Sequence, residues 1–169
     1  AASLPFGILV AWILAGLSFP GLSILDAIVH LPLILPPVVV GYVLLVTFGR
    51  RGILGEFLND TLGVSIAFSW QGAAVAGAVM AFPLMVRAIR LSIESVDQGL
   101  EQAARTLGAT PWRVFVTVTL PLTAPGLLTG CLLAFARSLG EFGATVAFVS
   151  NIPGETQTMP LALYALINS

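Results

Sequence analysis

The sequence predicts an all-α integral membrane protein that crosses the bilayer several times. The chain of 169 residues is 57% hydrophobic and only 9% charged, and it contains no lysine. Its mean hydropathy is +1.01, whereas soluble domains carry about 25% charged residues. Asp, Glu, Lys and Arg are absent from 1–25, 27–49, 61–86 and 114–136. Since about 20 apolar residues suffice for one span, each stretch is long enough to be a membrane helix.

We expect a single membrane domain over 1–169, truncated at both ends, because the chain starts without Met and stops inside an apolar stretch. The predicted membrane helices cover roughly 2–17, 24–48, 66–91 and 122–147, with a fifth starting at 159. The second of them contains Pro32, Pro36 and Pro37, and proline bends a helix by removing a backbone donor.

Small residues recur at intervals of four in the third and fourth predicted helices. They lie at 72–78, and at Gly126 and Gly130. Small side chains at this spacing let membrane helices approach closely, so we expect both helices to pack tightly against neighbours.

The connection 49–65 is polar and has room for a short surface helix. The connection 92–121 is more strongly patterned, because seven of the fifteen charged residues lie between Arg87 and Arg113. Glu94, Asp97, Glu101 and Arg105 are spaced as on one helical face. The apolar residues of the same stretch repeat on another face, which is typical of an amphipathic helix; they are Ile93, Val96, Leu100, Ala103 and Leu107.

A turn follows this predicted helix. Gly108 is a typical C-terminal stop, and Thr110 followed by Pro111 is typical of the cap and first turn of a new helix. The sequence therefore predicts two helices joined at a glycine.

The distribution of arginines predicts which connections lie on the cytoplasmic side of the membrane. Four of them, Arg87, Arg90, Arg105 and Arg113, flank or occupy 92–121, whereas Arg50 and Arg51 lie in the connection on the other side. Positive residues favour the cytoplasmic side, so we expect 92–121 in the cytoplasm. Its apolar face could lie on the membrane, pack on its own bundle or dock on a partner. The acidic polar face disfavours anionic cytoplasmic lipid.

The stretch 102–121 resembles the EAA loop of permease subunits of type I ATP-binding-cassette importers. That pattern is Glu-Ala-Ala, three residues, Gly, nine residues, an aliphatic residue, one residue and Leu-Pro. The matching residues are Ala103, Ala104, Gly108, Val118, Leu120 and Pro121. Gln102 stands where the pattern has Glu, and Glu101 precedes it.

The resemblance implies the type I importer permease fold and a coupling helix that sits in a groove of a cytoplasmic ATPase subunit. ATP binding would then move the permease as a rigid body. The residues expected to couple to the ATPase are Glu101, Gln102, Ala103, Ala104, Leu107, Gly108 and Pro121.

Beyond this loop, the stretches 30–45, 82–97 and 135–160 resemble molybdate permease subunits and, more loosely, sulfate and thiosulfate permeases. The resemblance implies a multi-pass protein of the bacterial or archaeal cytoplasmic membrane, in contact with lipid. It implies a permease homodimer, two ATPase subunits and an extracytoplasmic molybdate-binding protein. Sulfate, thiosulfate and tungstate remain alternative substrates, because tetrahedral oxyanions differ little in shape or charge.

Arg137 and Glu141 are the candidate pathway or gate residues. They lie one turn apart inside the fourth predicted span, and ionisable residues within a membrane are functional candidates. A guanidinium could attract a passing oxyanion. Alternatively, the two side chains could form an ion pair that neutralises both. We expect Arg137→Ala to reduce transport while leaving assembly intact.

Other function classes find little support in the sequence. No cluster of His and Cys predicts a metal, no base neighbours Ser138 or Cys131 to favour an intramembrane enzyme, and no GxxxxGK[ST] stretch predicts bound nucleotide. We therefore expect no catalytic residue, no cofactor, no metal and no nucleic-acid partner. A purely structural membrane scaffold remains the other alternative, against which the patterned 92–121 segment argues.

Overall fold

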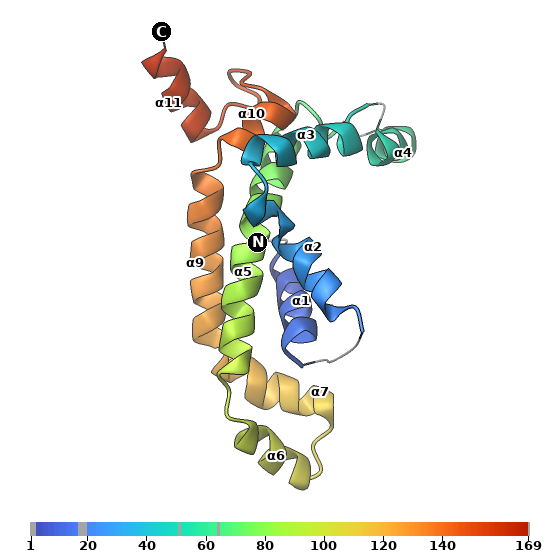
Figure 1. The fold of residues 1–169 in the computed structure, drawn as a ribbon, viewed down its shortest axis with the longest axis vertical. Helices are drawn as coiled ribbons and strands as arrows, with labels where there is room; N and C mark the ends of the chain where they lie inside the picture. The colour runs from blue at the N-terminus through green and yellow to red at the C-terminus, as the bar shows by residue number, and fades with distance from the viewer. Residues whose placement is uncertain (1–2, 17–19, 51, 64, 169) are drawn as a thin grey trace. The chain divides into compact units, whose positions relative to one another are not determined.

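The computed structural model describes residues 3–16, 20–50, 52–63 and 65–168. These residues form helices and no strand (Figure 1), which agrees with the expected all-α fold. In chain order the elements are α1 Leu4–Gly16, α2 Leu22–Ile34, α3 Pro37–Phe48, α4 Ile53–Leu62, α5 Trp70–Glu94, α6 Gln98–Thr106, α7 Pro111–Val114, the π-helix η1 Phe115–Thr119, α8 Leu120–Leu122, α9 Ala124–Leu139, α10 Gly143–Val149 and α11 Met159–Ile167. Residues 2 and 17, expected in the first helix, and Arg51 lie outside the described residues.

The expected continuous helix over 24–48 is instead two helices. α2 ends at Ile34 and α3 begins at Pro37, and their axes differ by 114°. Pro36 adopts φ −55° and ψ 134°, because the ring of the following proline disfavours helical backbone in the residue before it. Pro37 then starts α3 at a position where its missing N–H costs nothing. The proline pair therefore breaks the helix rather than merely bending it.

The expected fourth helix over 122–147 is also divided. α9 ends at Leu139 and α10 begins at Gly143. By contrast, α5 stays continuous over 25 residues, including Pro83. The Ser69 hydroxyl caps its start by accepting a hydrogen bond of 3.2 Å from the backbone N of Gly72.

Among the described residues, α5 is the one unbroken helix long and apolar enough to cross a membrane. The number rises to three if each bent pair is one span. These pairs are α2 with α3, and 111–122 with α9, where the bend is 65°. The five spans expected from the sequence therefore stay a prediction.

Contacts divide the chain into two compact units, and the single membrane domain over 1–169 expected from the sequence stays a prediction. Unit 1 comprises 1–28 and 84–134, and unit 2 comprises 29–83 and 135–169. The chain passes between them within α2, within α5 and in the second half of α9. Each unit is described below by itself.

The core of unit 2 forms where α3, α5 and α10 meet. Its buried residues are Val40, Leu44, Ala67, Ala76, Met80, Ala144, Phe148 and Val149. A Cβ added to Gly41 of α3 would lie 2.5 Å from the carbonyl oxygen of Ala144. α3 and α10 thus pack backbone to backbone, as small residues in membrane proteins permit.

The core of unit 1 lies along the second half of α5. Ala11 and Leu14 of α1 are buried, as are Met85, Val86 and Ile89 of α5. Gly126 and Gly130 of α9 face this helix, since added Cβ atoms would lie 2.1 Å from the Ser92 side chain and 3.3 Å from that of Ile89. The close packing predicted from their spacing is confirmed.

Candidate functional site

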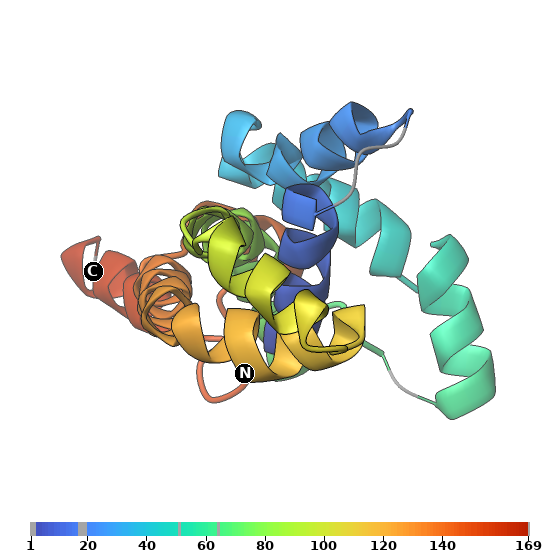
Figure 2. The ribbon, with the colours of Figure 1, turned by 90° about the horizontal axis from the view of Figure 1, so that it is seen from below.

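The segment 92–121, singled out by its charge pattern, lies in unit 1. Figure 2 shows α6 and α7 beside each other, in olive and gold. α6 begins where the Asp97 carboxylate caps it, by accepting a hydrogen bond of 2.7 Å from the N–H of Gly99. Aspartate at this position favours a helix start.

This cap corrects one expectation from the sequence. Glu94 is the last residue of α5, and Asp97 precedes α6 rather than lying within it. Glu94 and Asp97 therefore do not share one continuous helical face with Glu101 and Arg105. The cap competes with continuation of the helix, because a short acidic side chain satisfies backbone donors at a helix start.

The turn after α6 confirms the expected glycine stop. Gly108 has φ +84°, in the left-handed region that glycine adopts without steric cost. Its N–H donates to the Arg105 carbonyl at 2.9 Å, and the Ala109 N–H donates to that of Ala104 at 3.1 Å. The last carbonyls of α6 thus find donors in the turn, as at many helix ends.

The start of the next helix is also confirmed. The Thr110 hydroxyl accepts from the Arg113 N–H at 3.4 Å, and Pro111 is the first residue of α7. Four residues later the helix widens into η1. Pro121 follows this wide turn, where its missing N–H leaves one helical carbonyl without its usual donor. π-Helical turns of this kind are frequent at functional sites.

One contact within this segment was not predicted. The hydroxyl of Thr119 donates a hydrogen bond of 2.6 Å to Oε1 of Glu101, 18 residues earlier. It joins α6 to the last residue of η1. A single sequence carries no signal for this pairing, because the two residues belong to different helices.

The motif residues differ in how far they are exposed. Glu101 and Ala104 are half-buried, whereas Gln102, Ala103, Gly108 and Pro121 are exposed. Leu107 is 89% exposed and Leu100 is 49% exposed. Leu100 of α6 and Leu107 just after it are therefore accessible for contact with another molecule.

Behind α6 lies a polar cavity of about 580 Å³, confined to unit 1. Glu101, Gln102 and Arg105 line it, together with Thr119 of η1 and Trp12 of α1. Glu101 and Gln102, the residue before the acidic position of the motif and the residue at that position, therefore line the same polar cavity, with Arg105 beside them.

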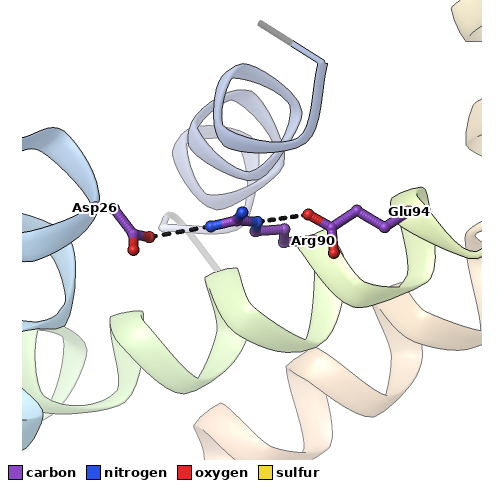
Figure 3. A network of polar contacts seen from close by, with 3 residues as sticks. All are labelled: Asp26, Arg90 and Glu94. Atoms are coloured by element: carbon purple, nitrogen blue, oxygen red, sulfur yellow. Dashed lines mark hydrogen bonds and ion pairs between the residues drawn. The ribbon is translucent and has the colours of Figure 1, made fainter. Parts of the chain in front are cut away.

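A three-residue ion network, also not predicted, joins α2 to the end of α5. Figure 3 shows the Arg90 side chain between Asp26 and Glu94. Its Nη1 lies 3.2 Å from Oδ1 of Asp26, and its Nε donates to Oε1 of Glu94 at 2.7 Å. All three side chains are partly exposed. Arg90 thereby fixes the end of α5 relative to α2 within unit 1.

The other candidate site, Arg137 with Glu141, lies in unit 2. Nη1 of Arg137 is 2.6 Å from Oε2 of Glu141, and the two side chains are 27% and 1% exposed. Oε1 of Glu141 accepts a hydrogen bond of 2.8 Å from the N–H of Ala144 in the first turn of α10. One carboxylate therefore neutralises the arginine and caps α10, so the ion pair weighed in the sequence analysis is formed.

Comparison with known families decides which class of protein this is. Residues 3–169 match the family of binding-protein-dependent transport system inner membrane components. The chain belongs to this family. Its members are described as inner membrane proteins, so the exposed apolar side chains on nearly every long helix are expected on surfaces that face lipid.

Individual relatives narrow the comparison within this inner-membrane family. The chain is 67% identical over 167 residues to the molybdenum transport system permease protein ModB of Escherichia coli K12, covering 99% of this chain and 73% of that protein. It is 61% identical to the protein of the same name from Haemophilus influenzae, with the same coverage. The sulfate transport system permease protein CysT of E. coli K12 is 41% identical, covering 94% of this chain and 57% of the relative.

Proposed function

We propose that this chain forms the membrane-spanning permease of an ATP-driven molybdate importer. The observation that carries the proposal is the difference in identity between the two kinds of relative. It is 67% for a molybdenum permease and 41% for a sulfate permease, both from E. coli K12. Tetrahedral oxyanions are too similar for the fold to separate them, so this difference favours molybdate over sulfate.

The proposal includes a cytoplasmic ATPase subunit as partner. The chain has no phosphate-binding GxxxxGK[ST] stretch, so in this proposal another subunit binds and hydrolyses ATP. The segment 92–121 is the proposed coupling segment. Its support is the exposed apolar surface at Leu100, Leu107 and Trp112, on short helices with capped ends. Burial of such side chains is a main source of binding free energy.

Two further partners belong to the proposal. An extracytoplasmic binding protein delivers the oxyanion, as the family description implies for its members. A second copy of the permease completes the translocation pathway between two membrane subunits. A purely structural scaffold would need neither partner.

Arg137 and Glu141 are the proposed gate of this pathway. Burial of the carboxylate beside α10 makes direct contact between Glu141 and an anion unfavourable, because two negative charges would meet in a medium of low polarity. Arg137 keeps more exposure and is the side chain of the pair that can attract the oxyanion. Movement of α9 relative to α10 would change the distance between the Arg137 guanidinium and the Glu141 carboxylate.

Reconstitution tests the proposed function. The full-length permease is placed in proteoliposomes with its ATPase and binding protein, and uptake of labelled molybdate is measured with and without ATP. We expect ATP-dependent uptake that tungstate inhibits more strongly than sulfate does. Equal uptake of sulfate would overturn the substrate, and absence of uptake for every oxyanion would overturn the importer.

A further inference from the structure

The hydrogen bond between Glu101 and Thr119 joins α6 to η1 inside the coupling segment. Its oxygen–oxygen distance of 2.6 Å is typical of a hydroxyl bound to an ionised carboxylate, which is stronger than a bond between neutral groups. Thr119 is only 3% exposed. Water therefore competes little for the hydroxyl end of this bond.

The bond joins two parts that the backbone holds together only loosely. α6 has nine residues, and isolated helices of that length are marginal in water. It is connected to the rest of unit 1 by the three residues after Glu94 and by the turn at Gly108, whose backbone is unusually free. The polar cavity of about 580 Å³ behind α6 leaves space into which an unattached α6 could move.

η1, in contrast, is firmly placed. The ring of Phe115 packs at 5.6 Å between centroids on Trp12 of α1, and at 5.8 Å on Trp112 of α7. Such aromatic pairs add to the burial of their surfaces. η1 continues through α8 to Leu122, and α9 starts at Ala124 after a bend of 65°. The backbone of Thr123 donates to the Thr119 carbonyl and accepts from the Leu127 N–H, so a displacement of η1 can still pass through this bend into a long helix.

We propose that Glu101 is a positioning residue: through Thr119 it makes α6 rigid with η1, so that a push on α6 moves α9 and is not lost in the Gly108 turn. This role rests on the proposed function. It also assigns different tasks to neighbouring residues. Glu101 acts inside the segment, whereas the exposed Gln102, at the acidic position of the motif, is left to meet the ATPase.

The test measures coupling, defined as oxyanion transported per ATP hydrolysed by the reconstituted transporter. Thr119→Val keeps the shape of the side chain and removes its hydroxyl. Since a hydrogen bond to a charged group changes an equilibrium by about ten- to a hundredfold, we expect coupling to fall by a factor of at least about ten, while the ATPase still binds and hydrolyses ATP. Thr119→Ser restores the donor and should restore coupling.

Thr117→Val is the matched control on the same π-helix. The Thr117 hydroxyl donates at 2.6 Å to the carbonyl of Arg113, one turn earlier in α7, and not to α6. It is exposed. We expect this variant to keep wild-type coupling, which separates loss of the link to α6 from loss of any threonine hydroxyl.

A double-mutant cycle with Glu101→Met, which removes the acceptor of this bond, shows whether the two residues act as a unit. The double variant should be no worse than Thr119→Val alone; losses that multiply would overturn the proposal. Wild-type coupling in Thr119→Val would overturn it as well. If that variant fails to assemble, Glu101→Met decides alone, because methionine has no oxygen to accept from Thr119 and unchanged coupling in it would contradict the role. Absence of uptake in the wild-type protein would instead overturn the proposed function.

Discussion

At the scale of single residues, Gly108 offers a clean test of the turn in the coupling segment. Its φ is +84° and nothing lies within 4 Å of an added Cβ, so alanine there would meet conformational strain and no clash. Left-handed backbone costs an L-residue about 1–2 kcal/mol. We expect Gly108→Ala to shift α6 and to reduce ATP-dependent uptake by the reconstituted transporter.

Gly154 supplies the control for this substitution. It has φ +81° and equally open surroundings, but it lies in the loop before α11, in unit 2. Gly154→Ala should lose the same stability and keep uptake. Equal uptake in the two variants would show that the Gly108 turn has no special part in coupling.

A test of the gate role of Arg137 and Glu141 requires that both residues are substituted together. Arg137→Ala alone leaves the Glu141 carboxylate, 1% exposed, without its counter-charge, and breaking a buried pair costs about 3–5 kcal/mol. Lost uptake in that variant would not separate misfolding from loss of a gate. Arg137→Met with Glu141→Gln removes both charges at nearly constant volume, and the amide oxygen can still accept from Ala144.

We expect this double variant to assemble normally, as judged by size-exclusion chromatography with the ATPase, and to lose oxyanion uptake. Normal assembly together with normal uptake would leave the ion pair a purely structural role. That result would remove both residues from the pathway.

Residues whose roles depend on their immediate neighbours could be predicted from the sequence. Gly108 and Thr110 are examples, since a positive φ and a helix cap are decided within a few residues. The bonds from Thr119 to Glu101 and from Arg90 to Asp26 span 18 and 64 residues. They depend on how helices pack, which the order of residues in one sequence does not reveal.

At the scale of secondary-structure elements, the packing of α3 on α10 is the most demanding contact. A Cβ on Gly41 would lie 2.5 Å from a backbone oxygen and 2.8 Å from the Cβ of Ala147. Neither atom can move away by a change of rotamer, as the end of a flexible side chain could. Overpacking of this kind costs about 1–3 kcal/mol, so we expect Gly41→Ala to lower the thermal midpoint of the purified protein.

Gly140→Ala is the comparison, because the nearest atom to its added Cβ is 3.8 Å away. Its thermal midpoint in the same detergent should stay close to that of the wild type. If Gly41→Ala were equally stable, the backbone contact between α3 and α10 would be looser than the distances in the structure indicate.

The break between α2 and α3 marks the limit of prediction for elements. Three prolines predicted a bend in the expected helix over 24–48, but they did not predict that the helix would break with an angle of 114° between its two parts. A proline removes one donor and excludes helical backbone before it; two in succession end the helix. The angle itself depends on α3 packing against α10, which is tertiary information.

At the scale of the whole molecule, the side of the membrane on which each connection lies can be measured. In a Cys131→Ser background, Leu107→Cys places a thiol at an exposed position just after α6, and Asn59→Cys places one at an exposed position of α4. The arginine bias predicts that a membrane-impermeant maleimide labels the first thiol only in inside-out vesicles and the second only in right-side-out vesicles.

A permeant maleimide should label both thiols in either preparation, which controls for accessibility. Labelling of both positions from the same side would contradict an odd number of membrane crossings between them. The broken helices make this measurement informative, because α5 alone is an unbroken span among the described residues.

The two kinds of ion pair in this protein differ in when they can form. Arg137 and Glu141 are four residues apart, so they can neutralise each other as that stretch leaves the ribosome and enters the bilayer, where a lone charge costs about 2.5–3.5 kcal/mol. Asp26 and Arg90 are 64 residues apart and have to wait until α2 and α5 are both inserted. We therefore expect the first pair to lower the cost of inserting its own segment, and the second to form only after both of its helices lie in the membrane.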